Sequence, residues 1–259
     1  MTPAIATSAL RKVYAASPNG RRPPGRPAPG EGGVVALEAL DLEVREGEFF
    51  GLLGPNGAGK STTLGILTRR IRPTAGTALV AGEDVVRHAP RVRQRIGVVP
   101  QRPNPDRGLD VSENLVFHAA YFGVPRGEAE QRAARLLETL SLTEKRGARV
   151  DELSGGQQQR LMIARALIHE PEVIFLDEPT AGVDFELRLE LWRYIRRLHA
   201  EGTTILLTTH YLEEAEELCE EIALIRGGRL LARDSADGLR ADYDATSLAD
   251  VYVKAMASR

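Results

Sequence analysis

The chain has 259 residues, of which 42% are apolar and 27% charged, and its net charge is −2. This composition suffices for one core with a sub-lobe, and the near-neutral charge argues against a nucleic acid partner. Cys219 is the only cysteine, which excludes an intrachain disulfide and favours a reducing cytoplasm. No run of about 18 apolar residues occurs, so we expect no membrane-spanning helix.

The first segment, residues 5–13, is a mixed apolar stretch that predicts an edge strand, and Tyr14 follows it. The ring of Tyr14 is suited to stack on a purine base, although an exposed tyrosine is more often an ordinary packing residue. Proline, glycine and arginine dominate residues 17–33, which predict a flexible surface loop. Strand character returns at residues 34–44.

A glycine-rich stretch, Gly54–Thr62, fits the phosphate-binding pattern G-x-x-x-x-G-K-[ST] in full. A buried strand is predicted before it at 48–53 and a helix after it at 62–67, which is the context that the motif requires. Glycines let the backbone approach a phosphate, and the helix N-terminus adds partial positive charge. We therefore expect a polyphosphate to be held by Gly54, Pro55, Asn56, Gly57, Ala58, Gly59, Lys60, Ser61 and Thr62.

Several polar side chains are suited to contact the phosphates or a metal ion. Lys60 supplies a full positive charge, while Thr62 can reach a phosphate oxygen. Ser61 places a hydroxyl where a phosphate-bound Mg²⁺ would sit. Gln101 follows the apolar strand predicted at 96–100. An amide at this position can bind both a metal and a water, although most loop glutamines do neither.

Between Arg102 and Leu153 the pattern changes from strands to helices. One helix is predicted to open at Ser112, and a second runs over about 127–140 with a stripe of buried alanine and leucine. This stretch therefore predicts a helical insertion in an otherwise α/β chain.

A second glycine-rich turn, Ser154-Gly155-Gly156-Gln157, opens an amphipathic helix. Its free N–H groups and hydroxyl suit an anion, although it carries no cation, and a simple capped helix is the alternative. Its occurrence beside a phosphate-binding loop favours the anion site.

Two carboxylates follow the apolar strand predicted at 173–176. A buried strand brings them to the ligand-binding edge of a parallel sheet. Because adjacent residues point in different directions, Asp177 is suited to hold Mg²⁺ and Glu178 to orient or deprotonate the attacking water.

Later residues complete the predicted site and the fold. Asp184 is either the N-cap of a helix that runs to about residue 200 or part of a subunit contact. His210 follows a buried strand, where its imidazole can donate to a terminal phosphate. A closing hairpin turned at Gly227 and Gly228 and a terminal helix over 247–256 are also predicted.

With these motifs in this order, the chain resembles the ATP-binding subunits of ABC transporters over about its whole length, and the Leu-Ser-Gly-Gly-Gln pentapeptide is specific to that family. The resemblance implies an α/β P-loop NTPase (RecA-like) core with an antiparallel β edge and a helical subdomain at about 102–155. An ABC ATPase domain over 1–240 and a short tail over 241–259 are expected. The resemblance also assigns a role to each motif. Gly54–Thr62 is Walker A, Ser154–Gln157 the signature and Val173–Asp177 Walker B. Tyr14 is the adenine-stacking aromatic, Gln101 the Q-loop glutamine, Glu178 the catalytic carboxylate, Asp184 the D-loop aspartate and His210 the switch histidine.

The resemblance also implies cofactors and partners. ATP and Mg²⁺ are expected, with each ATP buried between Walker A of one subunit and the signature of a second copy or of a homologous ATPase subunit. ATP would close the two subunits face to face, and its hydrolysis would reopen them. The helical insertion would transmit this closing and reopening to a separate transmembrane permease, with Gln101 as the hinge. The subunit is therefore expected at the cytoplasmic face of the membrane.

Finer likeness favours the exporter branch that handles drugs, polysaccharides or lipid-linked glycans, and it lies in residues 181–184, 208–215 and 247–252. An importer ATPase carries the same motifs and stays open. A soluble ABC protein of translation or DNA repair usually has two cassettes or a long coiled coil, neither of which is present. A non-hydrolysing regulatory module is disfavoured by the intact Glu178 and His210.

Overall fold

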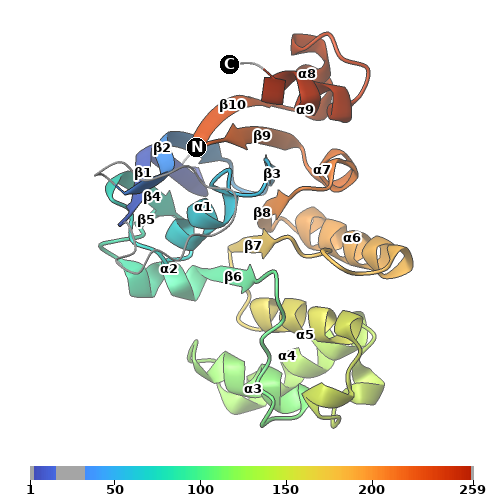
Figure 1. Ribbon diagram of the computed structural model, residues 1–259. Coiled ribbons are helices and arrows are strands. Elements are labelled where there is room, and N and C mark those ends of the chain that lie inside the picture. The colour runs from blue at the N-terminus through green and yellow to red at the C-terminus, as the bar shows by residue number, and fades with distance from the viewer. Residues whose placement is uncertain (1–2, 16–32, 258–259) are drawn as a thin grey trace.

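The computed structural model describes residues 3–15 and 33–257, and within them the chain forms two sheets and a helical lobe (Figure 1). The larger sheet has the strand order β10-β9-β3-β8-β7-β6 and the smaller one β2-β1-β4-β5. The predicted loop at 17–33 lies outside the described residues except for Gly33. No helix of the described part is long and apolar enough to cross a membrane.

The larger sheet is parallel at its centre. Its parallel strands are β3 (Phe49–Leu53), β6 (Ile96–Val99), β7 (Val173–Asp177), β8 (Thr204–Thr209) and β9 (Glu221–Arg226). Every residue of β3, β7 and β8 is buried, which explains their near-continuous apolar runs. Leu53 pairs with Thr209 and Asp177 with Thr208, so the carboxyl ends of β3, β7 and β8 share one edge. That edge positions the predicted site.

The antiparallel sheet corrects one expectation. β1 (Ile5–Tyr14) pairs with both β2 (Val34–Val44) and β4 (Ala75–Val80), so it is an internal strand and the predicted edge strand was wrong. β5 (Glu83–Asp84) extends the sheet beyond β4. Both partners of β1 follow it in the chain, and the pattern of one segment cannot show how many neighbours it will have.

The helical lobe contains α3 (Val111–Ala120), α4 (Arg126–Thr139) and α5 (Gly155–Leu167), with short 3₁₀ turns at Thr143–Lys145 and Val150–Glu152. α3 begins at Val111, one residue before the predicted start at Ser112, and Asp110 is its N-cap. The Asp110 carboxylate accepts from the backbone N–H of Glu113 at 2.7 Å, and the Glu113 carboxylate accepts from that of Asp110 at 2.9 Å.

The remaining helices surround the larger sheet. They are α1 (Lys60–Leu67), α2 (Ala89–Arg95), α6 (Phe185–Ala200), α7 (Leu212–Leu218), α8 (Ala236–Asp242) and α9 (Leu248–Ala257). The sequence did not predict α2, α7 or α8, because seven residues hold too little periodicity to identify a helix.

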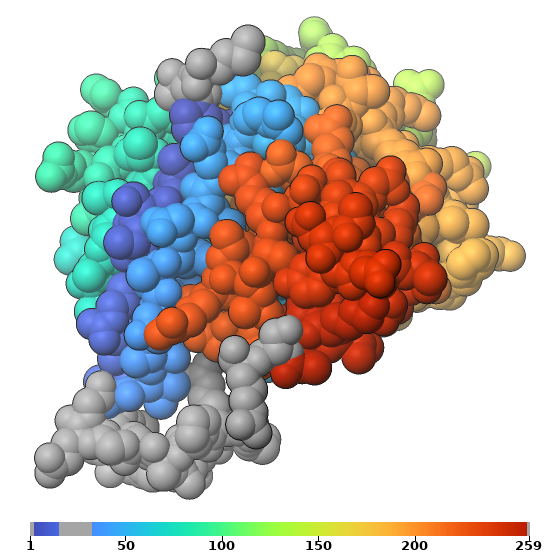
Figure 2. Space-filling view, turned by 90° about the horizontal axis from the view of Figure 1, so that it is seen from above, coloured from blue at the N-terminus to red at the C-terminus, as the bar shows by residue number. Residues whose placement is uncertain are grey.

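The C-terminal part confirms the predicted hairpin, formed by β9 and β10 (Arg229–Asp234), and the terminal helix α9. α8 spans the expected boundary at residue 240, and Leu248 and Val251 of α9 pack in one cluster with Leu53 of β3 and Leu224 of β9. Figure 2 shows the C-terminal helices, in red, gathered beside the orange hairpin of β9 and β10. The division of the chain at 240 stays a prediction.

The contact between β6 and α5 depends on a glycine. A Cβ at Gly97 would lie 2.3 Å from the carbonyl oxygen of Ala166 and 3.0 Å from a ring carbon of Pro171. We expect Gly97→Ala to lower the free energy of unfolding by about 1–3 kcal/mol, because β6 and α5 must separate to admit the methyl group. Urea unfolding measures this loss.

Gly127→Ala is the matched control, because a Cβ at that helical position meets nothing within 4 Å. It should leave stability unchanged or raise it slightly. Equal stability of the two variants would show that the contact between β6 and α5 is not tight.

Candidate active site

The loop between β3 and α1 has a backbone that requires glycine at several positions. Gly57 and Gly59 have φ of 81° and 116°, values that favour glycine. A Cβ at Gly54 would lie 2.3 Å from the carbonyl oxygen of Ile225, so β9 closes directly against the loop. No side chain caps the N-terminus of α1, which leaves its N–H groups available to an anion.

Lys60 is a buried cation held inside this loop. Its ammonium donates to the carbonyl oxygens of Gly54 at 2.6 Å and Pro55 at 3.4 Å, and it lies 3.9 Å from the Glu178 carboxylate. Burial lowers the pKa of Lys60, while Glu178 and Asp177 oppose that shift. The charge is therefore fixed between the loop and the carboxylates.

Glu178 is the point at which the predicted catalytic side chains meet. One of its carboxylate oxygens accepts from the Gln101 amide at 2.9 Å and lies 3.2 Å from Nδ1 of His210. The backbone of Glu178 has φ of 49°, and its N–H donates to the carbonyl oxygen of Thr208 at 2.9 Å. The structure thus brings Lys60, Gln101, Glu178 and His210 together from four different segments.

Asp177 lies at the end of β7 and is 7% exposed. The Thr208 hydroxyl donates to its carboxylate at 2.7 Å, which orients it. Ser61 is in the first turn of α1, and the Gln101 amide retains a carbonyl oxygen beyond its bond to Glu178. Hydroxyl, carboxylate and amide oxygens are the donors that Mg²⁺ accepts, so these residues fit the ion.

The described residues contain no group of three or more His, Cys, Asp or Glu side chains that could hold a metal ion.

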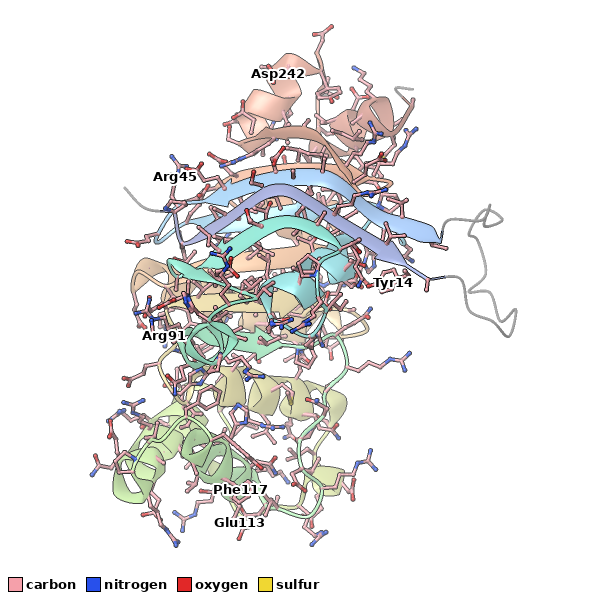
Figure 3. The ribbon with its side chains drawn as sticks, turned by 90° about the vertical axis from the view of Figure 1, so that its left-hand side faces the viewer. Tyr14, Arg45, Arg91, Glu113, Phe117 and Asp242 are labelled. Atoms are coloured by element: carbon pink, nitrogen blue, oxygen red, sulfur yellow. The ribbon has the colours of Figure 1, made fainter. Side chains whose placement is uncertain are left out.

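Tyr14 lies at the end of β1 (Figure 3), and its hydroxyl is 3.4 Å from that of Thr62 in α1. The Lys12 ammonium lies 5.0 Å from the ring centroid. The ring is therefore near the phosphate loop, and its contact with a base stays a prediction.

The signature turn lies elsewhere. α5 belongs to the helical lobe, apart from α1 in Figure 1, so one chain does not bring Ser154–Gln157 to the phosphate loop. The Ser154 hydroxyl accepts from the N–H of Gln157, and the Gln157 amide accepts from that of Ser154. A Cβ at Gly155 meets nothing within 4 Å, whereas one at Gly156 would lie 2.2 Å from Leu187.

Asp184 lies beside the signature. It is the N-cap of α6, where its carboxylate accepts from the N–H of Leu187 at 2.9 Å. Asp184, Ser154 and Gln157 line a common hollow of about 250 Å³. The capping alternative is therefore confirmed, and the subunit contact stays a prediction.

Sequence reasoning missed the side chains that hold the loop after Glu178. The buried Gln159 amide donates to the carbonyl oxygen of Pro179 at 2.9 Å. Glu214, fully buried in α7, accepts from the Thr180 hydroxyl at 2.8 Å and the Trp192 indole at 3.1 Å. Glu214 lies in an acidic run, and only its place on the buried side of α7 distinguishes it from its neighbours.

Comparison with known proteins identifies this arrangement. A family model described as ABC transporter matches residues 37–181, more than half of the chain. The chain belongs to the ABC transporter family. It is an ATP-binding subunit of that family and an ATPase, and its α/β fold is the predicted one.

Two curated relatives are both named Nod factor export ATP-binding protein I. The one from Ralstonia nicotianae is 43% identical over 251 residues, which are 97% of this chain and 73% of the relative. The one from Burkholderia orbicola is 44% identical over 221 residues, covering 85% of this chain and 73% of the relative.

Two solved structures have the same fold. An ATP-binding subunit of an ABC transporter is 27% identical with a TM-score of 0.84, covering 97% of this chain and 99% of that one. The ATP-binding cassette MJ0796, a dimer in a post-hydrolysis state with ADP and Pi, is 27% identical with a TM-score of 0.78. The match covers 89% of this chain and 98% of that one.

The Glu214 cluster yields a stability prediction for this ATPase. Glu214→Ala should lower the free energy of unfolding by roughly 2–4 kcal/mol, because the Thr180 hydroxyl and the Trp192 indole lose their acceptor in a buried site. Urea unfolding followed by tryptophan fluorescence measures the change.

Glu214→Gln keeps an acceptor for both groups and should stay within about 1 kcal/mol of the parent protein. Equal losses in the two variants would show that the negative charge of Glu214 accounts for its contribution, and that a neutral acceptor of the same size does not suffice.

Proposed function

We propose that the chain hydrolyses Mg²⁺-ATP at an interface between two subunits and thereby powers export through a separate transmembrane partner. The observation that carries the catalytic part is the Glu178 carboxylate, which contacts Gln101 and His210 and lies 3.9 Å from the Lys60 ammonium. A carboxylate surrounded by an amide, an imidazole and a cation at the edge of a parallel sheet suits hydrolysis of a phosphoanhydride.

Glu178 is the general base. Its carboxylate takes the proton of a water whose oxygen attacks the γ-phosphorus, and ADP leaves with the bridging oxygen. The Gln101 amide holds the carboxylate at 2.9 Å and orients the water. The His210 imidazole donates to the γ-phosphate, and Lys60 with the loop N–H groups stabilises the charge that develops on the phosphates.

Mg²⁺ would be held by Ser61, Asp177 and Gln101, and it would neutralise charge on the phosphate oxygens. The Thr208 hydroxyl, 2.7 Å from Asp177, keeps that carboxylate turned toward the sheet edge. Tyr14 stacks on the adenine, and its contact with Thr62 aligns the ring with α1.

The remaining ligands come from a second subunit. Ser154–Gln157 open α5 in the helical lobe, and Gly155 faces open space, so the turn is free to contact a phosphate outside its own chain. The MJ0796 cassette is a dimer, which supports pairing of this kind. A second copy or a homologous ATPase subunit therefore completes each ATP site.

A transmembrane permease is the other partner, and the subunit binds it at the cytoplasmic face of the membrane. Its docking surface is the helical lobe, where Phe117 of α3 and Tyr121, the C-cap of that helix, are 54% and 74% exposed and stack edge to face. Figure 3 shows Phe117 at the end of the molecule opposite the C-terminal helices. An importer ATPase carries the same motifs, but the names of the two relatives include the word export, which favours export. The expected substrate is a drug, a polysaccharide or a lipid-like molecule.

Glu178→Gln tests the general base. The amide keeps the size of the side chain but cannot accept a proton, so we expect ATPase activity to fall about 10²- to 10⁴-fold. The variant should still bind ATP and remain a dimer in ATP and magnesium. Phosphate release and size-exclusion chromatography measure the two effects.

Glu213→Gln is the control, because Glu213 is an exposed carboxylate in the same part of the chain. It should leave activity and association unchanged. If Glu178→Gln hydrolysed ATP at the parent rate, the assignment of the base would be wrong.

The composite site can be tested by mixing two inactive variants. Lys60→Ala removes the loop cation, and Gly155→Asp places a carboxylate against the phosphates of the other subunit. Gly155 has open space and begins a helix, so the aspartate should not disturb folding. Each variant alone should lack activity, whereas the mixture should regain it through heterodimers with one intact site.

Gly155→Ala, which adds no charge, should retain activity alone. An inactive mixture that nevertheless forms heterodimers would show that the signature does not act across the subunit interface.

A further inference from the structure

A second pocket lies away from the ATP site. It has a volume of about 400 Å³ and is lined by residues of α4, the end of α5, the segment before β7, and α6. Ile168 and Pro171 precede β7, whereas Asp177 and Glu178 lie at its carboxyl end, so the pocket and the ATP site lie at opposite ends of that strand. No residue with a predicted role in hydrolysis lines it.

Two cations of this pocket have no partner. Within residues 3–15 and 33–257, the guanidinium groups of Arg135 on α4 and Arg197 on α6 make no side-chain hydrogen bond or ion pair. A third arginine, Arg132, is satisfied by Glu128 at 2.6 Å and Glu170 at 2.9 Å. Two of the three arginines are therefore available to a ligand.

Tyr194 adds a hydrogen-bond donor to the same pocket. Its side chain is only 8% exposed and lines the pocket, yet its hydroxyl has no hydrogen-bond partner among the described residues. Burial raises the pKa of Tyr194 most, and the charge of Glu201 raises it further, whereas the charge of Arg197 lowers it. Since Glu201 and Arg197 both line the pocket, the phenol oxygen faces it and stays protonated.

Charge and polarity narrow the kind of ligand. Arg132 is paired with Glu170, so the remaining charges of the pocket are two arginines and the single carboxylate of Glu201. The net positive charge favours an anion. Guanidinium and phenol donors match the oxygens of a phosphate or carboxylate. Besides Thr139 and Thr203, the lining includes an apolar surface made by Leu136, Leu167 and Leu198. A ligand that carries only charge would leave this surface uncovered.

We propose that this pocket binds a small amphiphilic anion, with its phosphate or carboxylate on Arg135, Arg197 and the Tyr194 hydroxyl and its apolar body on the leucines. Because Arg135 belongs to the helical lobe and Arg197 to α6 of the core, the bound anion joins the lobe to the core. The volume of the pocket lies within the range of small-molecule sites.

Isothermal titration calorimetry of the full chain with hexyl phosphate tests the site. Saturating ADP is present throughout, so that the phosphate loop is occupied. We expect saturable binding of one hexyl phosphate per chain, at least about tenfold tighter than that of inorganic phosphate because the alkyl chain buries apolar surface. Hexanol, which shares the apolar body without the charge, should bind at least about tenfold more weakly.

Variants locate the site. Arg135→Gln combined with Arg197→Gln should weaken hexyl phosphate binding at least about tenfold, and Tyr194→Phe about two- to tenfold through the loss of one hydrogen bond. Arg193→Gln is the matched control, because Arg193 is an exposed arginine of α6 outside the pocket, and it should bind like the parent. Thermal unfolding without ligand verifies that each variant is folded.

Three results would overturn the proposal. They are the absence of saturable binding, equal binding by the parent and the double arginine variant, and inorganic phosphate that binds as tightly as hexyl phosphate. The last result would assign the pocket to free phosphate instead of an amphiphile.

Discussion

The parallel pairing of β3, β8 and β7 is the constraint on which the rest of the site depends. Because Leu53 pairs with Thr209 and Asp177 with Thr208, three strands end at one level. The phosphate loop, the carboxylates and His210 each follow one of those ends, so distant segments meet without any long connection. Since all three strands are buried on both faces, a shift in register would disrupt the core as well as the site.

The backbone at Glu178 explains how adjacent acids take different roles. Asp177 is the last residue of the strand, and its carboxylate accepts a hydrogen bond from the Thr208 hydroxyl. At Glu178, a φ of 49° turns the chain out of the sheet. A glutamate in this conformation costs of order 1 kcal/mol or more, and surrounding contacts must hold it. The N–H of Glu178 bound to Thr208, together with Thr180 bound to Glu214, provides those contacts. Strain is therefore placed where the carboxylate must point into the site.

The sequence predicted those parts of the molecule whose signals are local. Gly54–Thr62 and the two acids after β7 are contiguous patterns, and the structure assembles them as expected. The second neighbour of β1 and the contacts of Glu214 depend on segments far apart in the chain, and no local pattern encodes them. Short helices such as α7 were missed for a related reason, because packing against the core stabilises them more than their own periodicity does.

Two contacts suggest how the helical lobe can act on catalysis. The Arg165 side chain of α5 donates to the carbonyl oxygen of Asn104 at 3.0 Å, and His169 contacts that of Ile96 in β6 at 2.9 Å. Together they tie α5 and the turn that follows it to the segment that carries Gln101. A displacement of α5, which begins with the signature turn, would move this segment and strain the bond between Gln101 and Glu178. Under the proposed pairing of two subunits, these contacts would connect the signature of one subunit to the catalytic carboxylate of that same subunit, which is a route by which the two ATP sites would be coupled.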